Sequence, residues 1–65
     1  MNPDNLSWEH YYLRAIAGAR MNNQDVLTTN LARAVSMNGK VRNMAKDDME
    51  FFRFFKNPLF EAAIR

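Results

Sequence analysis

The sequence predicts an all-α protein, a small bundle of three helices or of three helices followed by a fourth short one. Three stretches carry apolar residues at intervals of three and four positions, and no stretch alternates apolar and polar residues over the length of a strand. The two glycines and two prolines fall where such helices should begin or end. With 65 residues, 48% hydrophobic and 25% charged, the chain has the composition of one small globular domain, which we expect to span residues 1–65.

The first helix is expected over residues 3–20. Its start can be capped in two ways, by Asn2 or by Ser7, which directly precedes Trp8. From Trp8 onward the apolar residues recur on one side of the helix. Gly18 interrupts this pattern at a cost of about 1 kcal/mol relative to alanine. We therefore expect either close packing at Gly18 or fraying beyond it.

The second helix is expected over residues 23–37. Asn22 or Asn23 can accept the free backbone N–H groups of its first turn. The helix should stop at Asn38 and Gly39, because both residue types tolerate the left-handed conformation that is common at helix C-termini.

The third helix is expected over residues 44–56, and the residues just before it can be a lead-in or its opening turn. Asp47 and Glu50 have the spacing of a capping box, so the helix should begin there at the latest. A proline follows Asn57 and disfavours the α conformation at that residue. A break at Asn57 and a last short helix over residues 58–64 are therefore predicted.

The expected core takes apolar side chains from each of the three main helices. Its members are Trp8, Tyr12, Ile16, Leu27, Leu31, Val35, Met44, Phe51, Phe52 and Phe55.

Five phenylalanines lie within the ten residues 51–60, which is an unusual surplus of large apolar groups. At about 100° per residue, Phe51, Phe52 and Phe55 share one arc of an α-helix, whereas Phe54 lies on the far side. The apolar arc then exceeds half of the circumference, while a helix packed on one side needs only somewhat more than about 100°. Either the last helix folds back so that one core absorbs all five rings, or part of the cluster forms a surface for a partner.

The second alternative leads to the favoured function, a non-enzymatic helical module that binds protein, as a homodimer or as a subunit of a larger assembly. The predicted interface consists of Phe54, Leu59, Phe60 and Ile64, with Arg53 and Lys56 at its charged rim. Binding to a membrane surface is disfavoured by the acidic residues at positions 47, 48 and 50.

The middle of the chain is basic, because residues 26–46 include no aspartate or glutamate. Within it, residues 31–44 resemble a helix-turn-helix unit in their spacing. Ala32 lies where that family has a small residue, Met37 where it has an apolar one, and Asn38 where its second helix is often capped. The resemblance implies a small DNA-binding regulator, again dimeric, as the alternative function.

Ser36 departs from this family, which usually has glycine at that place in the turn. The side chains that the resemblance would bring to DNA are Arg33, Lys40, Arg42, Asn43 and Lys46. The other interpretation of these residues is a solvated helix end, where lysine and arginine lie favourably near the negative C-terminus of a helix.

Several kinds of chemistry are not expected. The chain has no cysteine and one histidine, which disfavours disulfides and a zinc site, and its two glycines cannot build a phosphate-binding loop. We therefore expect no cofactor, no small-molecule substrate and no enzymatic activity. The first seven residues carry neither a basic group beyond the amino terminus nor a long apolar run, so a cytosolic location is expected. The small size is typical of accessory proteins of bacteriophages and mobile elements.

Overall fold

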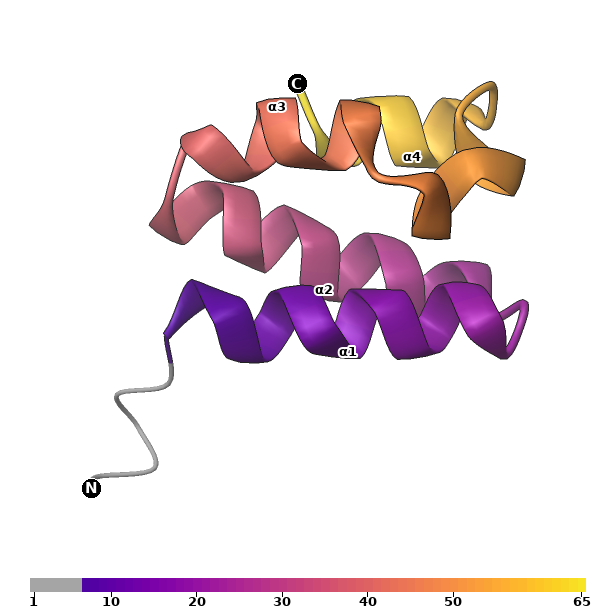
Figure 1. Ribbon diagram of the computed structural model, residues 1–65, viewed down its shortest axis with the longest axis horizontal. Coiled ribbons are helices and arrows are strands. Elements are labelled where there is room, and N and C mark those ends of the chain that lie inside the picture. Colours follow the sequence, from indigo (N-terminus) through magenta and orange to yellow (C-terminus); the bar gives the residue numbers. More distant parts are fainter. Residues whose placement is uncertain (1–6) are drawn as a thin grey trace.

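The computed structural model describes residues 7–65 and confirms the all-α fold class. This part of the chain contains four α-helices and one 3-10 helix, and no strand. They are α1 (Trp8–Arg20), α2 (Gln24–Met37), α3 (Lys40–Asp47), η2 (Met49–Phe54) and α4 (Pro58–Ala63) (Figure 1). The cap predicted at Asn2 and the helical start predicted for residues 3–6 lie outside the described residues. Within residues 7–65 the first helix begins after Ser7.

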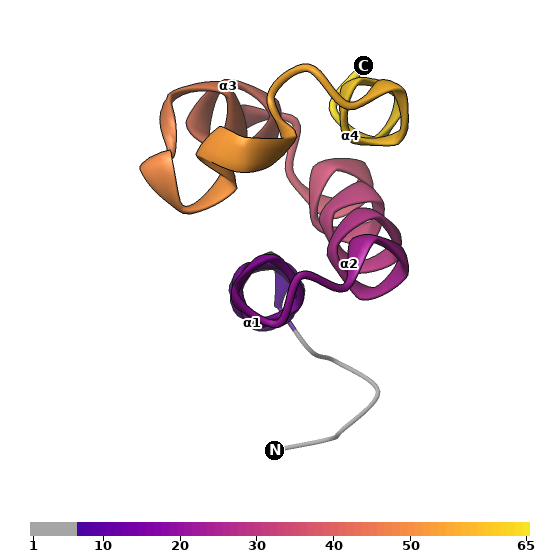
Figure 2. The same cartoon turned by 90° about the vertical axis from the view of Figure 1, so that its right-hand side faces the viewer.

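The bundle has an α1–α2 hairpin at its base and the later elements above it. α1 and α2 run antiparallel and make the most extensive contact between any two elements of residues 7–65 (Figure 1). Turned by 90°, the ribbon shows α3 and η2 on one side of the molecule and α4 on the other, over α2 (Figure 2). η2 packs on α1, while α3 and α4 pack on α2.

The turn between α1 and α2 is built from two asparagines. Asn22 has a positive φ of 57°, its N–H donates to the Ala19 carbonyl, and the N–H of Asn23 donates to the carbonyl of Gly18. These two bonds form the Schellman arrangement that closes a helix C-terminus. Asn23 then begins α2, because its side-chain oxygen accepts from the N–H of Val26 at 3.2 Å. The left-handed residue therefore lies at the end of α1.

The end of α2 is placed correctly by the sequence, but its geometry differs from the prediction. Asn38 is extended, with φ −148° and ψ 106°, and Gly39 has a right-handed φ of −59°. The Asn38 side-chain oxygen accepts from the N–H of Lys40 at 3.0 Å. Asn38 thus ends α2 and caps α3 without any left-handed residue.

Gly18 marks the closest approach of α1 to α2. A Cβ atom at this position would lie 2.6 Å from the backbone nitrogen of Leu27 and 3.0 Å from its Cα. Because both atoms belong to the backbone, they cannot move aside without separating the helices. Of the two alternatives for Gly18, the structure shows close packing.

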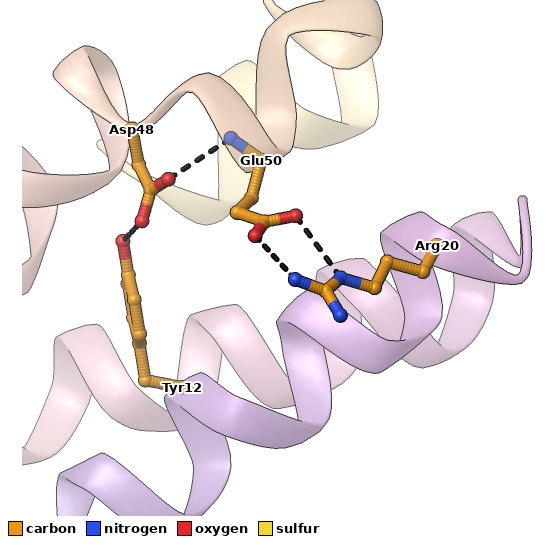
Figure 3. A network of polar contacts seen from close by, with 4 residues as sticks. All are labelled: Tyr12, Arg20, Asp48 and Glu50. Atoms are coloured by element: carbon orange, nitrogen blue, oxygen red, sulfur yellow. Dashed lines mark hydrogen bonds and ion pairs between the residues drawn. The ribbon is translucent and has the colours of Figure 1, made fainter.

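The third helix differs most from the prediction, because the chain leaves the α conformation at Asp48. Asp48 has φ −84° and ψ 115°, so residues 44–56 form the end of α3 and a separate 3-10 helix instead of one α-helix. One Asp48 carboxylate oxygen accepts from the N–H of Glu50 at 2.9 Å, and the other accepts from the Tyr12 hydroxyl at 2.5 Å (Figure 3). The cap expected at Asp47 is therefore one residue later, at a side chain that also binds α1.

Two further polar contacts join η2 to α1. Arg20 donates from Nε and Nη2 to the two carboxylate oxygens of Glu50, at 3.2 and 2.6 Å (Figure 3). This bond lowers the pKa of the Glu50 carboxyl. Arg20 and Glu50 form the one ion pair found within residues 7–65. Arg53 donates from its guanidinium to the Ala19 carbonyl at 3.2 Å, near the C-terminus of α1. η2 is thus held at three points on one helix.

The break at Asn57 and the short last helix agree with the prediction. The Asn57 side-chain oxygen accepts from the N–H groups of Leu59 and Phe60, at 2.8 and 3.4 Å. Its amide nitrogen donates to Gln24 at 2.5 Å, which ties the start of α4 to the start of α2. Phe60 of α4 and Ile64, which directly follows α4, are buried.

The core matches the prediction only in part: four of the ten predicted residues, Tyr12, Leu27, Leu31 and Phe51, are buried in it, four others are partly buried, and two are exceptions. Its buried apolar members within residues 7–65 are Tyr12, Ala15, Ala19, Leu27, Leu31, Ala34, Val41, Ala45, Phe51, Phe54, Phe60 and Ile64. The predicted members Trp8, Ile16, Val35 and Phe55 are partly buried against it.

The two exceptions, Met44 and Phe52, are exposed, and their prediction as core residues was wrong. On α3, Val41 and Ala45 take the buried side, and Met44 lies beyond its margin. Phe52 is displaced because its segment is not an α-helix.

The two glycines offer a matched test of the α1–α2 contact. Gly18→Ala should lower the free energy of unfolding, because the overpacking cost of about 1–3 kcal/mol exceeds the helix-propensity gain of about 1 kcal/mol. Gly39→Ala should raise it by about 0.4–1 kcal/mol, because a Cβ there meets no atom within 4 Å and φ already suits alanine. Urea denaturation of both variants measures the difference. Equal effects of the two substitutions would contradict the close approach at Gly18.

The Tyr12–Asp48 contact should make the protein sensitive to alkali. Burial, reinforced by the Asp48 carboxylate, raises the pKa of Tyr12 above its ordinary value of 10.0. The unfolded state therefore releases the phenolic proton first, so stability should fall as the pH rises above about 10. Tyr12→Phe should be less stable than the wild type at pH 8, by about 1 kcal/mol, and the difference should shrink at pH 11. Tyr11→Phe is the control in the same denaturation series, and a gap that stays constant with pH would refute this account.

Candidate functional site

The side chains of η2 follow a period of three residues. In a 3-10 helix residues i and i+3 lie above one another. Phe51 and Phe54 are accordingly both buried, at 0% and 7% exposure, whereas Met49 and Phe52 are 70% and 61% exposed. The bonding continues beyond η2, since the N–H of Phe55 donates to the Phe52 carbonyl. Phe55 therefore follows Met49 and Phe52 in the same row, although its side chain is partly buried.

We call Met49, Phe52 and Phe55 the apolar edge of η2. The rings of Phe52 and Phe55 meet edge to face, with centroids 6.0 Å apart and planes at 73°. Phe55 in turn contacts the buried Phe60 at 5.9 Å. The apolar edge is thus the part of the aromatic core that reaches the surface. Its outermost ring, that of Phe52, is exposed to solvent.

A charged row lies beside the apolar edge, at positions 50, 53 and 56. Glu50 is paired with Arg20, so its charge is balanced within the chain. Arg53 spends one donor on the Ala19 carbonyl and, because a guanidinium has five N–H donors, retains others for a ligand. Lys56 is exposed and makes no ion pair within residues 7–65. The row therefore presents positive charge next to exposed aromatic carbon.

In the structure, three of the six residues of the predicted protein interface are buried and three are exposed. Phe54, Phe60 and Ile64 are buried in the chain's own core, so the prediction that they face a partner was wrong. The reasons are the three-residue period of η2, which turns Phe54 inward, and the return of α4 onto α2. Leu59, on the outer side of α4, is exposed, and so are Arg53 and Lys56.

Two residues of the apolar edge were missed as surface residues. Phe52 was assigned to the core, and Met49 was not among the predicted interface residues. A recurrence of charge at every third position, Glu50, Arg53 and Lys56, is the signal in the sequence that could have revealed the 3-10 period.

The five residues of the predicted DNA-binding segment are all exposed: Arg33, Lys40, Arg42, Asn43 and Lys46. α2, a two-residue turn and α3 supply the order of a helix-turn-helix, although such turns usually have three or four residues. Figure 1 shows α3 running back along α2, opposite in direction. At about 100° per residue, Lys40 and Arg42 point to opposite sides of α3, while Lys46 lies about 40° from Arg42. The structure therefore distributes these cations around the helix pair.

A shallow cleft between α1 and α2 is lined by Tyr11, Arg33, Ser36 and Met37 and has a volume of about 160 Å³. The Arg33 guanidinium lies 5.8 Å from the centre of the Tyr11 ring, a cation–π distance. Sites for small molecules usually measure about 300–1,000 Å³. The cleft is below that range, and its cation is already placed on an aromatic ring.

Neither a metal site nor a membrane-spanning helix is found within residues 7–65. No three histidine, aspartate or glutamate side chains in this part gather closely enough to hold a metal ion. No helix in the same range has both the length and the apolar character that crossing a bilayer requires.

The assignment of Phe52 and Phe54 can be tested directly by truncation. Phe54→Ala should lower the free energy of unfolding by about 3–5 kcal/mol, or unfold the chain, because it empties a core position. Phe52→Ala should change it by about 0.5 kcal/mol or less, because the ring is solvated. Thermal and urea denaturation measure both variants. The reverse order of effects would show that residues 49–55 form an α-helix with Phe52 inside.

Comparison with models of protein families, with curated proteins and with solved structures found no match to this chain. The site is therefore defined by its own geometry, a row of apolar side chains beside a row of positive charge.

Proposed function

We propose that this chain is a non-enzymatic module that binds another protein through the apolar edge of η2. The single observation that supports the proposal is the 61% exposure of Phe52, in a helix whose other two phenylalanines, Phe51 and Phe54, are buried. Full burial of such a side chain contributes about 1.5–3 kcal/mol. Because Phe52 is already partly covered, a partner that buries the rest gains part of this energy, without any rearrangement of the core.

The character of the edge also favours protein as the ligand. Aromatic side chains, methionine and arginine are enriched in protein interfaces, and the edge and its rim contain Met49, Phe52, Phe55 and Arg53. Because η2 is fixed to α1 by Asp48, Glu50 and Arg53, its exposed side chains stand on a held backbone. Less freedom is then lost on binding.

The proposal includes two forms, a homo-oligomer and a subunit or accessory factor of a larger assembly, of the kind encoded by bacteriophages. In both, the same edge is covered and the cytosolic setting expected from the sequence applies. Leu59, on the outer side of α4, is the further exposed apolar residue of the C-terminal segment that the interface can include.

DNA binding through the basic segment remains the alternative proposal. It is supported by the exposure of the five side chains from Arg33 to Lys46 and by the absence of acidic residues from positions 26–46. Protein binding is preferred for two reasons. The cations lie on different sides of α2 and α3, and Asp47 is exposed directly after them, where it would repel a phosphate backbone.

Site-specific photocrosslinking in the producing cells tests the proposed function. A benzophenone amino acid replaces Phe52 in one variant and the exposed Thr29 of α2 in a matched control. Irradiation should give discrete adducts with protein at position 52 and none at position 29, because only the first position lies in the binding surface. The adduct mass, measured by gel and mass spectrometry, distinguishes a second copy of the chain from another protein. Similar adduct patterns at both positions would exclude the apolar edge as a binding surface.

A further inference from the structure

The apolar edge has a repeat that matches the repeat of an α-helix. Residues i and i+3 of a 3-10 helix are separated by about 6 Å along the axis, at about 2.0 Å per residue. Residues i and i+4 of an α-helix are separated by about 6 Å as well, at about 1.5 Å per residue. Met49, Phe52 and Phe55 follow one another at this three-residue interval. An α-helix laid along η2 can therefore place apolar side chains beside all three residues of the edge.

The charge beside the edge restricts what that helix can be. Glu50 is neutralised by Arg20, so Arg53 and Lys56 determine the sign of the row from position 50 to position 56, whereas the exposed Asp47 precedes the row at the end of α3. Arg53 is held in place by the Ala19 carbonyl and can still bind a carboxylate with its remaining N–H groups. A partner helix with glutamate or aspartate along its flank would satisfy both cations.

We propose that the partner of this chain is an acidic amphipathic α-helix of another protein, with apolar residues at positions i, i+4 and i+8 lying along Met49, Phe52 and Phe55. The inference rests on the proposed function and narrows it. A second copy of the chain fits this site less well, because its row offers the cations Arg53 and Lys56, and its one carboxylate, Glu50, is already paired with Arg20. Like charges brought together oppose association.

Three labelled peptides of equal length provide the test, in fluorescence anisotropy titrations with the full chain. The first has leucines at i, i+4 and i+8 with flanking glutamates. The second has the same leucines with flanking lysines, and the third has the composition of the first with the leucines spread around the helix. The wild type should bind the first peptide about tenfold or more tightly than either of the others, and added salt should reduce its preference over the lysine peptide.

Two variants assign the effect to the site. Phe52→Ser should weaken binding of the first peptide about tenfold or more, because the central anchor is lost. Lys56→Glu should abolish the preference for the glutamate peptide over the lysine peptide, because the new carboxylate offsets the charge of Arg53. Thr29→Ser on α2 is the control and should bind as the wild type does.

The outcomes that would overturn the inference are distinct from those that would overturn the proposed function. Equal affinity for the glutamate and lysine peptides, equal affinity for the spread leucines, or no binding of the first peptide would each refute an acidic helix as the partner. A solution mass that doubles with concentration in the wild type but not in Phe52→Ser would assign the edge to a second copy. In all of these cases a crosslink from position 52 to protein would leave the binding function standing.

Discussion

The position of Asp48 is the constraint on which the rest of the structure depends. Its carboxylate accepts from the Tyr12 hydroxyl and from the N–H of Glu50, so the chain must leave the α conformation between α3 and η2. Since Tyr12 and Asp48 are 36 positions apart in the chain, this bond also fixes η2 on α1. The direction in which every later side chain points follows from that break.

The change of helical period decides which phenylalanines are inside. With 3.6 residues per turn, Phe51 and Phe55 would share the buried side and Phe54 would face outward. With three residues per turn, Phe51 and Phe54 share it and Phe52 is exposed. The core therefore absorbs most of the aromatic surplus, while the remaining part is gathered on one edge beside two cations.

The parts of the fold that the sequence predicted are those set by local chemistry. The break at Asn57 and the end of α2 at Asn38 were predicted, and the cap at Asn23 and the close packing at Gly18 were each one of two alternatives; all depend on residues near in sequence or on the size of one side chain. The α-helical class and part of the core, Tyr12, Leu27, Leu31 and Phe51, followed from apolar periodicity. Asp48 could not be recognised in this way, because Asp47 offers the same cap and the partner that selects Asp48 lies on another helix. The predicted interface failed for the same reason, since the burial of Phe54 and Phe60 depends on how the segment is bent.

Six of the aromatic rings form one continuous series of contacts. Trp8 touches Tyr12, Tyr12 touches Phe51, Phe51 touches Phe60, and Phe60 touches Phe55, with centroids 5.6–6.1 Å apart at each step. Close-packed rings have little free space, so a shift of one must be taken up by its neighbours. The series of ring contacts therefore begins at Trp8, the single tryptophan of the chain, and ends at Phe52. The emission of Trp8 can therefore report on the packing of these rings.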